Sequence, residues 1–402
     1  MKILMLTPYL PFPPSSGGQI RSYNLIKQLS EKHEITLFCY IRKKEEEKFL
    51  PELKKYCKKV KVFVRRKAWN PFNVLLAGLT QYPFLVCIYL SNAFKKAVTE
   101  ELSGSSYDLI HAETFYVMTN IPQTRTPILL VEQTIEYLVY KHYVEGLKNI
   151  FLKWLLSIDV AKLRFWETNF WKKADEVVAV SEADKNEMLK LAPQLKVNLV
   201  PNGVNLSFFK VKKKWKDDNP RILFVANFKW LQNIEAARLL LEEVFPRVRK
   251  RFSKAKVWVV GQFIPDTIRR YRADDVIIES LLEADQESIR EAYYNSSVFV
   301  SPLRGPGGTR LKHFGAMAAK LPLVTTTVGA EGLGAGDGKE IIIRDDPEDI
   351  AQAVLKVLSD ERYARKIAEN ARELVEEKYS WYKMGQYLDR IYEKTGTLRN
   401  NS

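Results

Sequence analysis

The stretch from Ser301 to Leu333 constrains the fold of this chain more than any other. It follows SVFV (residues 297–300), whose β-branched and aromatic residues are typical of a buried strand. A loop with three glycines among four residues, 305–308, comes next, and apolar residues then recur at helical spacing until Pro322. The following apolar run, LPLVTTTVG, predicts another strand. This order of strand, glycine loop, helix and strand predicts a βαβ unit of a parallel sheet.

The glycine loop also has the chemistry of an anion-binding site. Thr309 is a suitable N-cap, and the free N–H groups at a helix N-terminus attract anions. Arg310 and Lys312 lie in the predicted first turn, where acidic residues are usual because the helix dipole is already positive there. The two cations indicate a polyanionic ligand, and an ordinary solvated glycine turn is the alternative. The glycine spacing matches neither a dinucleotide fingerprint nor a P-loop.

The size and charge of the chain narrow the possibilities. With 402 residues, 46% of them hydrophobic, the chain suits two α/β domains of about 200 residues each. Its 63 Lys and Arg against 48 Asp and Glu give a formal charge of +15, which favours an anionic partner. The three cysteines and four histidines are scattered, so we expect a reducing compartment and neither a disulfide framework nor a metal site. The apolar run after Met1 is too short for a signal peptide.

Strands and helices alternate in both halves of the chain. KILML (residues 2–6) predicts the first buried strand, and the proline-rich loop after it ends in Gly17-Gly18, which we expect near a ligand. VKKKWKDDNP (residues 211–220) is charged and poor in apolar residues, so it is the predicted linker. RILFVANF (residues 221–228) begins a second series of strands. The pattern predicts two doubly wound α/β domains that face a cleft.

A basic segment in the first half is followed by an apolar one. Lys58 to Lys67 alternates basic with apolar residues, and residues 69–90 are mainly apolar but contain Gln81 and Pro83. Gln81 and Pro83 interrupt this segment, and each uninterrupted apolar run is shorter than the roughly 20 residues that a spanning helix needs, so we expect no transmembrane helix. Two interpretations stay open, namely a segment that lies on an anionic membrane surface and an ordinary core element.

Taken together, the motifs resemble those of the family 4 retaining glycosyltransferases, along nearly the full length of the chain. The matching pieces, in chain order, are PFPPSSGGQIRSYNLIKQLS, AVSEADKNEML, VPNGVNL, Trp230 and Asn233 of NFKWLQN, PLRGPGGTRLK, TTTVGAEGL, DDPEDIAQAVLKVLSD and EEKYSW. The chain looks most similar to bacterial sugar transferases of surface polysaccharide synthesis. The resemblance implies the GT-B fold, in which two Rossmann-like domains face an interdomain cleft and the last helix crosses back to the first domain. The implied parts are an acceptor-side domain (1–205 plus about 382–402), a linker (206–220) and a nucleotide-sugar-binding domain (221–381).

The resemblance also implies an activity. It implies transfer of a hexose from a UDP- or GDP-linked sugar to a glycan or lipid-linked acceptor, without a cofactor or a required metal. The implied location is the cytoplasm, peripheral to the inner face of the membrane. The reaction releases a nucleoside diphosphate, so catalysis largely means stabilising a developing negative charge. We expect no nucleic-acid partner, because the basic residues are dispersed and no nucleic-acid-binding motif is present.

Site residues follow from the same resemblance. Arg310, Lys312 and Gln133 occupy the catalytic positions, with Gln133 at a strand end close to the transferred sugar. The positions expected to bind the donor are Gly17, Gly18, Asn227, Arg304, Gly307, Gly308, Thr309, Leu311, Gly315 and Glu331. No residue is expected to bind a metal.

Four positions depart from the family pattern. The family commonly has two glutamates where this chain has Gly307 and Gly315, and the second of them binds the donor ribose. Gln133 stands where the family has a histidine, and Ala226 where it has a glycine. Each hydrogen bond lost to a polar substrate costs roughly 1.5–3 kcal/mol. The alternative hypothesis is therefore a weakened or inactive homologue that acts as a nucleotide-sugar-binding or assembly subunit.

Overall fold

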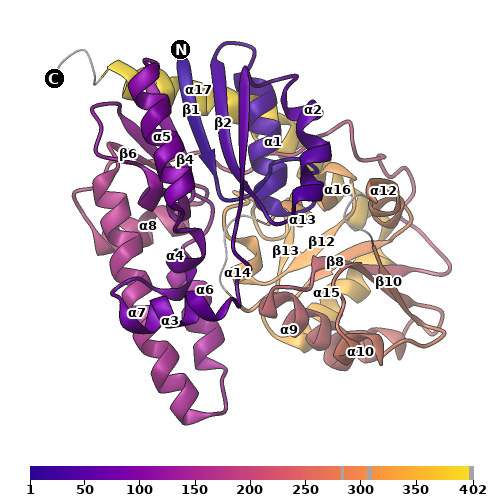
Figure 1. The fold of residues 1–402 in the computed structure, drawn as a ribbon. Coiled ribbons are helices and arrows are strands. Elements are labelled where there is room, and N and C mark those ends of the chain that lie inside the picture. The colour runs from indigo at the N-terminus through magenta and orange to yellow at the C-terminus, as the bar shows by residue number, and fades with distance from the viewer. Residues whose placement is uncertain (282–284, 306–309, 398–402) are drawn as a thin grey trace. The chain divides into compact units, whose positions relative to one another are not determined.

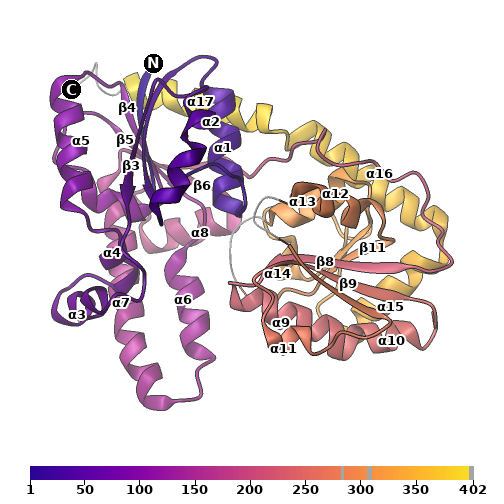
Figure 2. The same cartoon turned by 45° about the vertical axis from the view of Figure 1, so that its right-hand side comes forward.

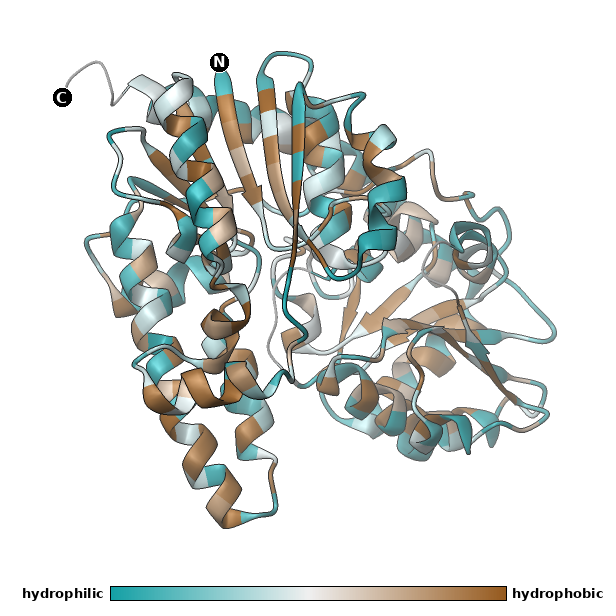
Figure 3. Cartoon of the chain, in the orientation of Figure 1, coloured by the Kyte–Doolittle hydropathy of each residue, from teal (hydrophilic) through white to brown (hydrophobic). Residues whose placement is uncertain are grey.

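The computed structural model describes residues 1–281, 285–305 and 310–397 (Figure 1). The chain forms two compact units. Unit 1 contains Met1–Pro201 and Met384–Ser402, and unit 2 contains Asn202–Lys383. Each unit has its own parallel sheet, and apolar residues dominate the strands of both sheets (Figure 3).

The sheet of unit 1 has seven strands in the order β3-β2-β1-β4-β5-β6-β7. The strands are β1 (Lys2–Thr7), β2 (Glu34–Ile41), β3 (Lys59–Val64), β4 (Leu109–Glu113), β5 (Ile128–Glu132), β6 (Glu176–Ala179) and β7 (Val197–Leu199). The central strands β4 and β5 are buried along their whole length, as continuous apolar strands of parallel sheets are. The chain reverses its direction of travel across the sheet between β1 and β4, and ligands of such sheets bind at that point, beyond the carboxyl ends of the strands.

The helices of unit 1 include a projecting hairpin. They are α1 (Gly17–Leu29), η1 (Lys44–Phe49), α2 (Leu50–Leu53), α3 (Pro71–Leu79), α4 (Phe84–Tyr89), α5 (Asn92–Gly104), η2 (Phe115–Asn120), α6 (Glu136–Glu145), α7 (Ile150–Lys173), α8 (Glu182–Leu191) and α17 (Trp381–Thr397). Helices α6 and α7 form an antiparallel pair that extends beyond the sheet of this unit (Figure 2). The inner part of α7 packs on the core through Phe170 and Trp171.

The sheet of unit 2 has six parallel strands in the order β10-β9-β8-β11-β12-β13, and it reverses between β8 and β11. The strands are β8 (Arg221–Asn227), β9 (Lys256–Gln262), β10 (Val276–Ser280), β11 (Val298–Ser301), β12 (Leu323–Thr325) and β13 (Ile342–Ile343). The helices are α9 (Leu231–Leu239), η3 (Leu240–Val244), α10 (Phe245–Arg249), α11 (Asp266–Arg269), α12 (Gln286–Tyr294), α13 (Leu311–Ala318), α14 (Thr327–Ala330), α15 (Pro347–Ser359) and α16 (Glu361–Lys378). Helices α12 and α13 lie on one face of the sheet, and α9, α10 and α15 lie on the other (Figure 2).

The predicted linker does not run free of the second unit. The ring of Phe209 lies 5.2 Å from that of Tyr293, and the amide of Lys212 donates to the carbonyl oxygen of Ala319 at 2.9 Å. Trp215 is buried in the core of unit 2. Phe209 and Trp215 therefore attach residues 206–220 to unit 2, although the segment is rich in charged residues.

Two local predictions are wrong. Gly17-Gly18 was expected in the loop after β1 but forms the start of α1. The second apolar run of the βαβ unit is a strand only over Leu323–Thr325, because Thr326 then caps the short helix α14.

Candidate functional site

The candidate donor site of unit 2 lies at the carboxyl edge of the sheet, between β8 and β11. Asn227 ends β8, and Arg304 follows β11 with an exposed side chain. Arg310 is the N-cap residue of α13, and its Nη2 donates to the carbonyl oxygen of Gly305 at 2.9 Å. The expected N-cap, Thr309, lies outside the described residues together with Gly307 and Gly308. The described part of the βαβ unit thus places Arg310 and Leu311 at the start of its helix, as the sequence indicates.

Lys312 connects α13 to the strand on the other side of the reversal point. Its Nζ donates to Asn233 Oδ1 at 2.7 Å and lies 4.6 Å from the centre of the Phe224 ring. Asn233 Nδ2 in turn donates to the carbonyl oxygen of Asn227 at 2.8 Å. Burial, together with the charge of Arg310, holds the pKa of Lys312 well below its usual value. Two cations so close together, one of them with a lowered pKa, are an arrangement that a bound polyanion stabilises.

Two further groups stand near these cations. Glu331 follows α14, and partial burial raises its pKa while the guanidinium of Arg310 acts in the opposite direction. His313, which the sequence did not indicate, is buried and lies 2.9 Å from the carbonyl oxygen of Gly329 through Nδ1. Burial lowers the pKa of His313, and Lys312 and Arg310 lower it further. A neutral His313 therefore ties α13 to α14, which precedes Glu331.

Gly315 has a packing role in unit 2. A Cβ built on this residue would lie 2.8 Å from Cζ of Phe209 and 3.2 Å from Cζ of Tyr293. The space that a side chain at this position would occupy is therefore already filled by two aromatic rings, one of them from the supposed linker. Close packing accounts for the glycine without any contact to a ligand.

In unit 1, Gly18 and Gln133 come together at the reversal point between β1 and β4. A Cβ on Gly18 would lie 2.6 Å from Gln133 Oε1 and 2.7 Å from the hydroxyl oxygen of Tyr9, so only glycine fits there without a shift. Gln133 Nε2 donates to the Tyr9 hydroxyl at 2.6 Å and to the carboxylate of Glu113. Gly17, the neighbouring residue, is exposed. The side-chain amide of Gln133, which stands where the family has a histidine, is thus held by Tyr9 and Glu113.

A buried charged network, which the sequence did not indicate, lies beneath Gln133. Arg21 and Glu113 are almost fully buried, with Arg21 Nε 3.8 Å from Glu113 Oε1. His111 Nε2 lies 2.7 Å from Glu113 Oε2, and its Nδ1 contacts the hydroxyl of Tyr392. Burial opposes ionisation of Glu113, but His111, Arg21 and the amide of Gln133 outweigh it and lower its pKa. The sequence shows that a charged residue, Glu113, ends an apolar strand. It does not indicate that Arg21 and His111 are its partners.

Other classes of site find no support in the part of the chain that the structure describes. Within residues 1–281, 285–305 and 310–397, no three His, Cys, Asp or Glu side chains gather as metal ligands. The cysteines Cys39, Cys57 and Cys87 are buried and unpaired with one another. Over the same ranges, no helix is both long and apolar enough to cross a membrane.

Comparison with known proteins agrees with this arrangement. Residues 15–208 match the model described as Glycosyltransferase Family 4, and residues 219–360 match the model described as Glycosyl transferases group 1. A protein of Klebsiella pneumoniae, described as an uncharacterized 44.6 kDa protein in cps region, is 22% identical over 392 residues, which are 94% of this chain and 96% of that protein.

Solved structures give the fold. Sucrose-phosphate synthase from Thermosynechococcus elongatus is 17% identical with a TM-score of 0.73, and the likeness covers 100% of both chains. Anabaena Alr3699/HepE, solved in complex with UDP-glucose, is 14% identical with a TM-score of 0.65, over 98% of this chain and 100% of that one. Two parallel Rossmann-like sheets with this likeness define a GT-B protein. The chain belongs to the family 4 glycosyltransferases and is a transferase of sugars.

Proposed function

We propose that the protein is a retaining hexosyltransferase that moves a hexose from a UDP- or GDP-linked sugar to a glycan or lipid-linked acceptor. Its family supplies the reaction type, and the similar HepE structure holds UDP-glucose. The Klebsiella relative in a cps region supports a place in surface polysaccharide synthesis. Such synthesis at the cytoplasmic membrane face suits a chain with a formal charge of +15.

The pair Arg310 and Lys312 carries this proposal. The bond between the anomeric carbon and the diphosphate oxygen breaks, and the leaving diphosphate gains negative charge. Arg310 at the N-cap of α13 and Lys312 two residues further on are positioned to neutralise that charge, together with the free N–H groups of the helix start. Because these donors are in place before the reaction, we propose that no metal ion is required for departure of the diphosphate.

The packing of Gly315 favours the active enzyme over the weakened homologue. The glycine was the main reason to consider a lost ribose contact. Its contacts with Phe209 and Tyr293 provide an independent reason for its presence. We propose that other groups at the same edge, Asn227 and Glu331, take part in donor binding.

Titration calorimetry with a nucleoside diphosphate and with the bare nucleoside tests the assignment. Arg310→Ala should weaken binding of UDP or GDP about tenfold to a hundredfold, because a charge-assisted contact contributes about 1.5–3 kcal/mol, and should leave binding of the nucleoside unchanged. Arg251→Ala, at an exposed position of unit 2, is the matched control. Equal weakening of nucleotide and nucleoside would place Arg310 outside the diphosphate site.

A further inference from the structure

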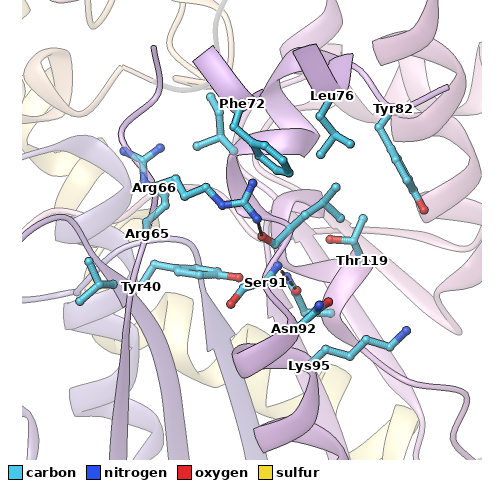
Figure 4. Close-up of a pocket in the computed structure, with 14 residues that line it drawn as sticks. Tyr40, Arg65, Arg66, Phe72, Leu76, Tyr82, Ser91, Asn92, Lys95 and Thr119 are labelled. Carbon is cyan, nitrogen blue, oxygen red and sulfur yellow. Dashed lines mark hydrogen bonds between the residues drawn. The ribbon is translucent and has the colours of Figure 1, made fainter. Parts of the chain in front are cut away.

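Unit 1 contains a pocket that the proposed reaction has not used. It has a volume of about 440 Å³ and lies between the ends of β2 and β3, helix α3, the start of α5 and η2 (Figure 4). Tyr40, Phe72 and Leu76 provide apolar surface, and Arg65, Arg66 and Lys95 provide positive charge. The hydroxyl of Thr119 also lines it and is buried without a hydrogen-bond partner among the described residues. The pocket therefore combines apolar walls with cations and an unused polar group.

Within the described residues, the cations of this pocket have no carboxylate partner. Arg66 donates to the carbonyl oxygen of Leu90 at 3.1 Å and stacks over Phe72 at 4.8 Å, and the guanidinium of Arg65 lies 5.0 Å from the ring centre of Tyr89. In the part of the chain that the structure describes, Arg65, Arg66 and Lys95 form no ion pair with a carboxylate. Residues 53–99 contain ten Lys and Arg and no Asp or Glu. The missing counter-charge must therefore come from solvent ions or from an anionic ligand.

Helix α3 forms one wall of the pocket and is exposed on its outer side. Leu75 and Leu79 of this helix are 58% and 77% exposed, and Trp69 just before it is 83% exposed. Polar contacts hold the helix in place, because Asn70 caps its start and Lys162 of α7 donates to the carbonyl oxygens of Ala77 and Thr80. An apolar helix face that a protein builds and leaves uncovered indicates a binding surface.

The end of the α6–α7 hairpin continues this apolar surface. Ile150 and Phe151 are 83% and 73% exposed, and Trp154 follows one turn later on α7. The hairpin end appears as apolar as α3, which lies beside α7 (Figures 1 and 3). Residues 146–158 contain two lysines and no acidic residue. Apolar and aromatic side chains with lysines between them, and no carboxylates, are the composition of a surface that inserts into anionic lipid.

We propose that unit 1 binds a lipid with a phosphate headgroup. The phosphate lies in the pocket against Arg65, Arg66 and Lys95, and the chains of the lipid lie along α3 and the end of the α6–α7 hairpin. The surface is thus centred on these helices, whereas most of the basic segment Lys58–Lys67 forms the edge strand β3. The role of this lipid as the sugar acceptor rests on the proposed function, whereas binding of the lipid does not depend on that function.

Sedimentation with vesicles of phosphatidylcholine, with and without phosphatidic acid, tests the proposal on the full chain. We expect binding that requires phosphatidic acid. Arg65→Gln with Arg66→Gln should weaken it about tenfold or more, because each cation at an anionic surface contributes about 1 kcal/mol. Leu75→Ser with Leu79→Ser, at exposed positions, should weaken it through loss of apolar contact. Lys43→Gln with Lys44→Gln removes the same charge from exposed positions elsewhere in unit 1 and should have little effect.

Several outcomes would overturn the proposal. These are absence of binding to both vesicle types, equal weakening by the Lys43 and Lys44 changes, and unchanged binding of the Leu75 and Leu79 variant. Release of the protein by glycerol phosphate at matched ionic strength would indicate a soluble phosphate ligand in place of a lipid. UDP affinity, measured on every variant, should be unchanged. Failure of nucleotide binding with intact lipid binding would contradict the proposed function and leave the lipid site standing.

Discussion

At the scale of single residues, Gly315 and Lys312 show how packing decides chemistry. Gly315 stands where the resemblance implies a donor contact, yet the aromatic rings of Phe209 and Tyr293 occupy the space of its missing side chain. Lys312 stands where the resemblance implies a catalytic cation, and its hydrogen bond to Asn233 and its burial beside Arg310 agree with that role. The same helix thus carries one position that packs in the core and one that we propose for binding the donor.

Gly315→Glu combined with Phe209→Ala tests the packing role. Gly315→Glu alone should destabilise the protein by about 1–3 kcal/mol, because the new side chain must displace an aromatic ring. Phe209→Ala in the same chain should recover part of that loss, so the two changes are not additive in urea unfolding. Additive losses, or tighter binding of UDP by the Gly315→Glu variant at unchanged stability, would show that position 315 is open to the donor.

Lys312 should take up a proton when a diphosphate binds. Its pKa is held low by burial and by Arg310 in the free protein, and a dianion beside it raises the pKa again. The binding enthalpy of UDP, measured by calorimetry in buffers of different ionisation enthalpy, should therefore show proton uptake that grows as the pH rises. Lys312→Arg keeps the charge permanently and should abolish the uptake at this site. Uptake that persists in this variant would assign the proton to another group.

At the scale of elements, three carboxyl groups gather at the start of α6, of which Glu132 and Glu167 are buried and Glu136 is half-buried. Glu167 of α7 accepts hydrogen bonds from the amides of Glu136 (2.8 Å) and Tyr137 (3.1 Å), and Glu132 accepts from Trp171 Nε1 at 3.0 Å. Burial raises the pKa of all three carboxyls, that of Glu136 to about 7. The α6–α7 hairpin, which carries the proposed lipid surface, thus begins at carboxyl groups whose raised pKa favours their protonated form.

This cluster predicts that stability falls as the pH rises from 5 to 8. An unfolded Glu titrates near pH 4.3, so the raised pKa of Glu136 contributes stability that is present at low pH and lost as the pH passes about 7. The loss for this group should be about 1–3 kcal/mol, and Glu136→Gln should remove that part of the slope. Urea unfolding at several pH values measures both. A wild-type slope identical to that of Glu136→Gln would contradict the assignment.

Sequence patterns predicted the positions of the strands and helices better than they predicted the contacts between them. The apolar runs of β1, β8 and β11 are strands at nearly the expected residues, because buried parallel strands have continuous apolar sequences. Residues 206–220, the predicted linker, pack on unit 2 through Phe209 and Trp215, and the charge of the segment does not indicate these contacts. The pair of Arg21 and Glu113 joins residues 92 positions apart, and neither local sequence carries any sign of the other.

At the scale of the whole molecule, two Rossmann-like units each place polar groups at the reversal point of a parallel sheet. Unit 1 has the Gly18 and Gln133 contact above a buried charged network, and unit 2 has Arg310 and Lys312 at the start of α13. Two glycosyltransferase models match 15–208 and 219–360, so both units belong to one transferase chain. Donor cleavage is therefore expected of the intact chain.

Proton NMR of the full chain with a panel of UDP- and GDP-hexoses tests this account most directly. We predict release of the nucleoside diphosphate from at least one donor, at the same rate with and without EDTA. The hexose should first appear with the anomeric configuration of that donor, and Arg310→Ala should slow the release at least tenfold. Release of the opposite anomer would contradict the retaining mechanism. Failure of every donor to bind or to be cleaved would contradict the central claim.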